Sequence, residues 1–172
     1  QAEPSLKITY VQPKDFTGLL RYVRNILVVT IDPTAYTKVS VGYENNVWAR
    51  GQVVVSLKAP NTESIVEYSK THEKALVDFF VKVEMNRAIE QLQKEYSMVV
   101  MDNLKSDLNV MLNAPANFTY YKDTTDFFWS SNNANTGRMD LIVYTFPYTD
   151  PNTFTEEYLV AKRDSVLKAN LP

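Results

Sequence analysis

Four aspartates near the carboxyl end of the chain could carry hydrolytic chemistry. Asp123 and Asp126 flank one aromatic segment, and Asp140 and Asp150 flank another. A glycoside hydrolase needs two carboxyl groups that face one another across a cleft, about 5 to 10 Å apart, at any separation in sequence. Aspartate is also typical of turns and strand ends, which is the interpretation that we favour for all four. A carboxylate-dependent hydrolase acting on envelope or dietary polysaccharide stays as the alternative function, with Asp123, Asp126 and Asp140 as its first candidates.

Aromatic side chains offer a second kind of chemistry, the binding of sugars. The chain has 11 Tyr and 2 Trp. Such rings can stack on the apolar face of a pyranose while neighbouring amides bind its hydroxyl groups. Trp48 stands beside Asn45, Asn46 and Gly51, so we expect it in or next to a loop, where contact residues are common. Packing of the rings within sheets is the structural alternative. The candidate ligand contacts are Trp48, Trp129, Tyr43 and Arg50.

Motifs for cofactors, metals and activated nucleophiles are missing from the sequence. The single histidine, His72, excludes a zinc protease helix and a serine triad, and its position on an apolar helical stripe predicts a packed or boundary imidazole. A calcium loop of the form Asp-x-Asp-x-Asp-Gly is absent, and there is no cysteine. The four glycines are too far apart for a phosphate loop: Gly18, Gly42, Gly51 and Gly137. We therefore predict no cofactor, no metal and no catalytic residue.

The charge balance restricts the partners. Eighteen basic and twenty acidic side chains give a net charge of −2, which leaves no basic excess for a nucleic-acid backbone. No stretch approaches the roughly 18 apolar residues of a membrane-spanning helix. A membrane could then be reached only through a lipid anchor absent from this chain.

Hydrophobic patterning predicts strands in the first third of the chain and helices after them. The candidate strands are residues 6–11, 24–31, 38–43 and 52–58. The strand over 24–31 has apolar residues on both faces and is predicted to be central, whereas the strand over 6–11 lies between prolines and is predicted to be an edge. Residues 60–115 contain no internal proline or glycine, so they are predicted to be helical with a bend between two apolar stripes, ending in a strand over 108–112.

The last third alternates aromatic strands with turns. The candidate strands are residues 118–122, 126–130 and 139–146, with a polar hairpin loop over 131–137. Thr153 and Glu156 form a capping-box pattern that predicts a closing helix. The order favours an α+β fold, with a mainly antiparallel sheet, long helices packed on one face and a C-terminal helix. We expect a single domain over residues 1–172, part of a longer natural chain.

Three short patterns carry a resemblance to a family. They are Arg24-Asn25-Ile26-Leu27, Trp48-Ala49 followed by Gln52, and the segment from Arg163 to Lys168. With them the chain resembles an uncharacterised family of envelope lipoproteins from Bacteroidetes-type bacteria, a domain of unknown function. Gly51 stands where the family pattern leads us to expect proline.

The resemblance implies a location but no activity. It places the domain in the cell envelope, periplasmic or surface-exposed, with a lipid anchor in the precursor. The absence of catalytic signatures then favours a non-catalytic envelope domain that binds a protein or glycan partner.

Overall fold

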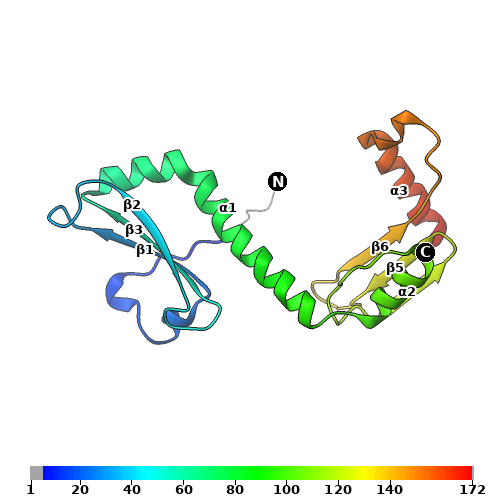
Figure 1. Cartoon of the computed structure of the whole chain (residues 1–172), viewed down its shortest axis with the longest axis horizontal. Coiled ribbons are helices and arrows are strands. Elements are labelled where there is room, and N and C mark those ends of the chain that lie inside the picture. Colours follow the sequence, from blue (N-terminus) through cyan, green and yellow to red (C-terminus); the bar gives the residue numbers. More distant parts are fainter. Residues whose placement is uncertain (1–5, 172) are drawn as a thin grey trace. The chain divides into compact units, whose positions relative to one another are not determined.

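The structure is a computed structural model that describes residues 6–171, and it divides into two compact units (Figure 1). The first unit comprises Gln1–Glu90 and the second comprises Gln91–Pro172. Each unit has a three-stranded sheet accompanied by helices, so the predicted α+β class is confirmed. The sequence led us to expect one domain over residues 1–172. The structure instead has two compact units, each with its own sheet.

The first unit has a mixed sheet. The strand order is β1-β3-β2, in which β3 runs parallel to β1 and antiparallel to β2. Two short 3-10 helices precede the sheet, and a long helix follows it. The elements are η1 (Pro13–Asp15), η2 (Gly18–Tyr22), β1 (Asn25–Ile31), β2 (Ser40–Asn45), β3 (Val53–Ala59) and α1 (Thr62–Lys94).

Two of the predicted strand roles are wrong. Residues 24–31 were predicted to be the central strand, yet β1 lies at an edge and β3 is central. Val55, Leu57 and Ala59 of β3 are buried, because β3 alone has a strand on each side. Residues 6–11 form no strand, and Ile8 and Tyr10 are exposed. Alternating apolar and polar residues would give a strand one apolar face. A strand also needs a neighbour to pair with, and residues 6–11 have none in the described part of the chain.

Helix α1 covers one face of this sheet. Phe79 packs against Tyr43 of β2 with ring centroids 5.2 Å apart. Glu84 accepts a hydrogen bond of 2.6 Å from the Asn25 side chain of β1. The helix has a kink at His72, with φ −117° and ψ 17°, but His72 lies within the first apolar stripe and the bend was predicted between the two stripes. The His72 ring is exposed and stacks on Tyr68 at 4.0 Å instead of packing into a core.

The second unit has an antiparallel sheet in the order β4-β5-β6. Its elements are α2 (Met98–Leu108), β4 (Tyr120–Thr124), β5 (Phe127–Ser131), β6 (Asp140–Tyr144), η3 (Pro151–Phe154) and α3 (Glu156–Asn170). The predicted strand over 108–112 is wrong, because α2 ends at Leu108 with Asn109 in the left-handed conformation. The closing helix is present, but its N-cap is Thr155, whose hydroxyl accepts from the Tyr158 N–H, and Thr153 is buried in η3.

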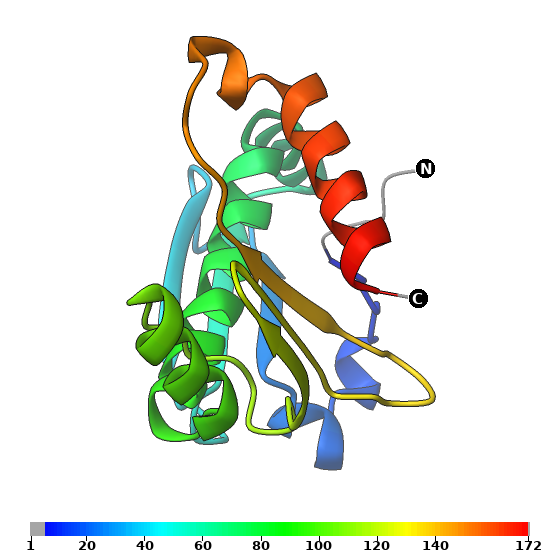
Figure 2. The ribbon, with the colours of Figure 1, turned by 90° about the vertical axis from the view of Figure 1, so that its right-hand side faces the viewer.

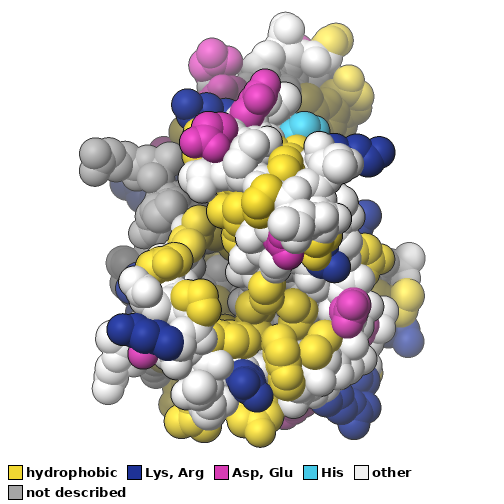
Figure 3. Space-filling model, turned by 90° about the vertical axis from the view of Figure 1, so that its left-hand side faces the viewer, with side chains coloured by type: hydrophobic (Ala, Val, Ile, Leu, Met, Phe, Trp, Pro, Cys, Tyr) yellow, Lys and Arg dark blue, Asp and Glu magenta, His cyan; other side chains and the backbone are white. Residues whose placement is uncertain are grey.

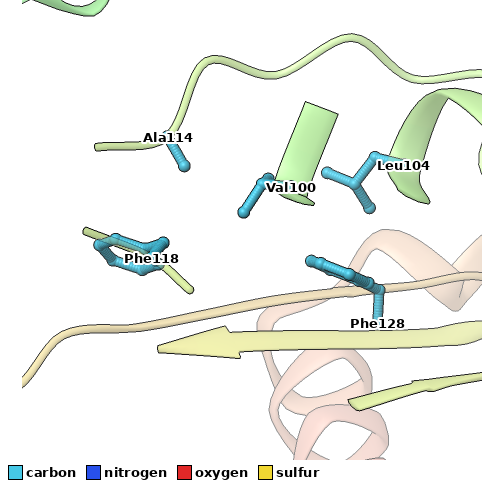
Figure 4. Close-up of a cluster of buried hydrophobic side chains, with 5 residues drawn as sticks. All are labelled: Val100, Leu104, Ala114, Phe118 and Phe128. Atoms are coloured by element: carbon cyan, nitrogen blue, oxygen red, sulfur yellow. The ribbon is translucent and has the colours of Figure 1, made fainter. Parts of the chain in front are cut away.

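Helices lie on both faces of the second sheet (Figures 1 and 2). On one face Phe128 of β5 packs with Val100 and Leu104 of α2, and with Ala114 and Phe118 (Figure 4). On the other face the Lys122 ammonium group of β4 donates a hydrogen bond to the Asn170 carbonyl of α3. None of the helices that the structure describes has the length and apolar composition needed to cross a membrane.

The connection between α1 and α2 is short and well anchored at its end. Ser97 is buried and caps α2 by accepting from the Val100 N–H. Its backbone N–H donates to the Ala114 carbonyl at 2.9 Å, and its hydroxyl donates to the Phe118 carbonyl at 2.6 Å. Ser97 is therefore part of the second unit.

Candidate functional site

The loop between β2 and β3 carries Trp48 and is held in a defined conformation. Asn46 and Gly51 both adopt the left-handed region, with φ of 59° and 75°. The Gly51 N–H donates to the Asn46 side-chain oxygen at 2.6 Å, which closes the loop. Proline, with φ fixed near −65°, cannot adopt the conformation of Gly51. The loop geometry therefore accounts for glycine where the resemblance led us to expect proline.

The buried side chain of Gln52 holds the same loop in place through hydrogen bonds. Its side chain is 1% exposed, and its amide nitrogen donates to the carbonyl oxygens of Arg21 and Val23, each at 2.7 Å. Its side-chain oxygen accepts a hydrogen bond of 3.0 Å from the backbone N–H of Trp48. One buried amide thus joins the segment before β1 to the Trp48 loop. The sequence singled out Gln52 only as part of a family pattern and could not reveal this role.

The Trp48 ring is half-buried. It packs edge-to-face against Phe16, with centroids 5.5 Å apart and an interplanar angle of 72°. The residue is 37% exposed, so part of the indole remains open to solvent. Arg50, two residues later in the same loop, is exposed. A half-exposed indole and an exposed guanidinium group in one loop are suited to a ring-shaped or anionic partner.

Tyr43 lies on the strand that leads into this loop. It is 60% exposed even though its ring contacts Phe79. A shallow hollow of about 240 Å³ lies at the same part of the sheet, but its Glu44, Ser56 and Lys58 side chains project to the face opposite the Tyr43 ring. The carboxylate, ammonium and hydroxyl groups of this hollow could bind sugar hydroxyls.

Trp129 belongs to the second unit and has different surroundings. Its indole N–H donates to the Asp140 carboxylate at 3.0 Å, and the Arg138 guanidinium lies 6.0 Å from the ring centroid. The polar edge of the ring is therefore already bound. Trp48, Arg50 and Tyr43 lie on neighbouring segments of one unit, whereas Trp129 lies in the other.

The three candidate aspartates of the second unit do not meet. Asp123 is opposite Phe128 in the sheet and so shares the α2 face, whereas Asp140 is opposite Ser131 and points to the other face. Asp126 occupies the β4–β5 turn in the left-handed region, with φ 62°, and accepts from the Thr145 hydroxyl at 2.7 Å. These placements match the strand and turn roles that we favoured.

The carboxyl group of Asp140 is held as an anion. Burial would raise its pKa, but hydrogen bonds from Arg138, Ser131 and Trp129, with the charge of Arg138, outweigh burial and lower the pKa below its usual value. A carboxyl group with a lowered pKa is poorly suited to act as a general acid at neutral pH.

Asp123 is paired with an aspartate that sequence analysis missed, Asp107 of α2. Burial raises the pKa of Asp123, and the hydrogen bond and negative charge of Asp107 raise it further. Hydrogen bonds from Ser106 and Asp123 lower the pKa of Asp107. Helix α2 and strand β4 are far apart in sequence, so no local pattern could have predicted the pair.

This pair predicts a pH-dependent stability. Folding raises the pKa of Asp123, so protonated Asp123 stabilises the folded state. This contribution is complete below the pKa of Asp123 in the unfolded chain, about 4, and is lost as the pH rises through its pKa in the folded state. We expect Asp123→Asn to have a slightly higher melting temperature than the wild type at pH 7. The difference should disappear below about pH 4, where Asp123 is protonated in both states.

Thermal unfolding followed by circular dichroism from pH 3 to pH 8 measures this difference. Asp102→Asn, at an exposed position on helix α2 of the same unit, controls for the removal of one negative charge. A difference between Asp123→Asn and the wild type that stays constant over the whole pH range would contradict the prediction.

No group of three or more metal-ligating side chains gathers among residues 6–171. A family model described as Domain of unknown function (DUF8532) matches residues 1–93, which is more than half of the 172 residues. The chain belongs to the DUF8532 family. A second model, Domain of unknown function (DUF4837), matches residues 97–172. The DUF8532 match ends close to the division between the two structural units.

The membership agrees with the resemblance to an uncharacterised family and brings no activity. Both matched models are domains of unknown function. No curated protein and no solved structure matches the chain. The DUF8532 match contains the Trp48 loop, and the DUF4837 match contains Trp129 and the aspartates discussed above.

Proposed function

We propose that the chain is a non-catalytic binding domain that contacts its partner through the Trp48 loop. The observation that carries this proposal is a half-exposed indole on a loop fixed by a buried glutamine. A contact residue that is already ordered costs little conformational entropy on binding. Tryptophan and arginine are also enriched among the residues that dominate binding energies. Trp48 and Arg50 provide both within one loop.

We further propose that the domain works in the cell envelope, periplasmic or surface-exposed, and that its precursor carries a lipid anchor. The resemblance of the sequence to envelope lipoproteins supports this location. The near balance of charges, at a net −2, agrees with a partner that is not a nucleic acid. The partner is then an envelope protein or a glycan.

A glycan is the more specific form of the proposal. Trp48 would stack on a sugar ring, and Tyr43 and Arg50 would supply hydrogen bonds. The polar hollow that contains Glu44 and Lys58 is not part of this site, because these side chains project to the opposite face of the sheet from the Tyr43 ring. Trp129 is the weaker of the two tryptophan candidates, because its N–H already binds Asp140.

Trp48→Ala tests this use of the loop. We expect the variant to lose at least tenfold in affinity for the glycan, with a melting temperature close to that of the wild type, because the residue is not fully buried. Binding is measured by calorimetry on glycans selected from an array. Tyr148→Ala, which removes another exposed ring, is the matched control and should bind as the wild type does.

Capture from the cells of origin separates the two kinds of partner. The full-length protein is crosslinked in place and purified, and both proteins and polysaccharides in the eluate are identified. A stoichiometric protein that is lost with the Trp48→Ala bait supports a protein partner and removes the glycan form. Polysaccharide lost with the same bait supports the glycan form. Collapse of the fold in Trp48→Ala would remove Trp48 as a contact.

The alternative, a carboxylate-dependent hydrolase, draws support from the opposite pKa shifts of Asp107 and Asp123. These two carboxyl groups, however, interact directly with one another, whereas a glycosidase holds its two carboxyl groups at least about 5 Å apart with the substrate between them. The test is hydrolysis of envelope and dietary polysaccharides by the wild type and Asp123→Asn. Activity that disappears in the variant would favour the hydrolase over the binding domain.

A further inference from the structure

Strand β1 has an unprotected outer edge. Among the residues that the structure describes, β1 pairs only with β3, so its other side has no neighbouring strand. Its seven residues, Asn-Ile-Leu-Val-Val-Thr-Ile, include no charge, no proline and no glycine. Natural proteins protect edge strands with charged residues, proline or bulges, because a bare edge pairs with other strands. The other described edge strands all carry charge: Glu44 in β2, Lys122 and Asp123 in β4, and Asp140 in β6.

The side chains of this edge are apolar and open. Leu27, Val29 and Ile31 are 44%, 47% and 46% exposed, while the neighbouring positions of β3 on the same face are buried. Figure 3, which looks onto the first unit, shows hydrophobic side chains gathered in exposed patches. A strand added beside β1 would bury these three side chains and bind the free backbone groups.

We propose that this strand is β1 of a second copy of the chain, running antiparallel about a twofold axis at Val28. Val28 is the middle residue of β1, so the two seven-residue strands would overlap fully. Leu27 then lies opposite Val29 of the partner subunit, and Val29 opposite Leu27 of the partner subunit. Cross-strand apolar pairs of this kind stabilise antiparallel sheets. The two three-stranded sheets become one sheet of six strands.

Charge complementarity supports a second copy as the occupant. Arg24 and Asp32 flank β1 and are four residues from Val28 on either side. The same register therefore places Arg24 opposite Asp32 of the partner subunit, and the twofold axis gives the dimer two such pairs. The Arg24 side chain is 71% exposed and lies 3.7 Å from the Glu84 carboxylate of its own chain, so Asp32 of the partner subunit would be its second acidic neighbour. The Asp32 carboxylate is fixed at the strand end by the Thr34 N–H at 2.8 Å and the Ala35 N–H at 3.1 Å. Pairing along a single seven-residue strand forms a small interface, and interfaces below about 1,200 Å² are typical of weak association, so we expect a dissociation constant in the micromolar range.

Sedimentation of the full chain over a range of concentrations tests the dimer. We expect a monomer–dimer equilibrium that Val29→Lys weakens at least tenfold, because the lysine would lie against apolar residues of the other copy. Val41→Lys is the matched control, since Val41 is 44% exposed on the same face at the opposite edge of the sheet. A monomer at all concentrations up to 0.1 mM, ~100 times a micromolar dissociation constant, would overturn the proposal. So would a dimer that is broken by Val41→Lys and not by Val29→Lys.

A single introduced cysteine tests the register, because the chain has no cysteine of its own. Directly opposite residues in antiparallel strands have Cα atoms about 4.5 to 5.5 Å apart, within the range of a disulfide. Val28→Cys should therefore form a disulfide-linked dimer on mild oxidation. Thr30→Cys should not, because the two copies of residue 30 would be displaced by four residues, about 13 Å along the strands. Equal crosslinking of the two variants, or of Thr30→Cys alone, would overturn the proposed register.

Discussion

Gln52→Ala is expected to lower the free energy of unfolding of the first unit by about 2 to 4 kcal/mol. The change removes three hydrogen bonds from a side chain that is 1% exposed. Three backbone groups would lose their partner together: the carbonyl groups of Arg21 and Val23 and the N–H of Trp48. A buried polar group left without a partner costs more than the net gain of the bond that it made. The effect should exceed that of removing any exposed side chain of this unit.

Unfolding in urea, with hydrogen exchange of the β1–β3 amides as the readout, measures this loss. Gln12→Ala is the control, because Gln12 is exposed and belongs to the same unit. Gln52→Glu adds a sharper comparison, since it keeps the size of the side chain but removes the amide donor. It should be destabilised at least as much as Gln52→Ala, because a carboxylate would face two carbonyl oxygens. If both variants lose less than about 1 kcal/mol of unfolding free energy, water replaces the hydrogen bonds of the Gln52 side chain without a net cost.

Phe128→Ala is expected to destabilise the second unit by about 3 to 5 kcal/mol, which is typical of a buried phenylalanine reduced to alanine. Phe128 is 2% exposed and packs between α2 and the sheet, against Val100 and Leu104. The change leaves a cavity at the centre of the only cluster of buried hydrophobic residues found in the described chain outside the first sheet. The small size of this core makes the loss a large part of the stability of the unit.

Hydrogen exchange resolved by peptide separates this effect from a general one. Protection should fall in α2 and β4–β6 of Phe128→Ala. Phe154→Ala, at a position 71% exposed, controls for the loss of an aromatic ring and should change stability little. Equal loss of protection in both variants would show that the Phe128 cluster is not the stabilising core of this unit.

Features that depend on local sequence were predictable. The period-two pattern of residues 52–58 identified β3, and the polar segment 131–137 identified the β5–β6 hairpin loop. The closing helix was predicted from the capping-box pattern of Thr153 and Glu156, although the N-cap is Thr155 because η3 intervenes. In each case the residues that determine the element lie within a few positions of one another.

Features that depend on distant partners were not predictable. The apolar run of β1 is compatible with a central or an edge position, and only pairing decides between them. The Asp107–Asp123 pair and the bonds of Gln52 to Arg21 and Val23 join segments that no periodicity relates. Trp48 was found as a candidate contact because its neighbours favour a loop. The bound N–H of Trp129 could not be foreseen, since it depends on Asp140 of the neighbouring strand.

The short connection after α1 has a practical consequence for genetics and protein production. Lys94 ends α1, Ser97 is tied to Ala114 and Phe118, and only Glu95 and Tyr96 stand between them. Codons 95 and 96 are therefore the place to divide the gene, because a cut one residue later would remove the serine that caps α2. Two plasmids split at this point would show whether each half accumulates in cells by itself.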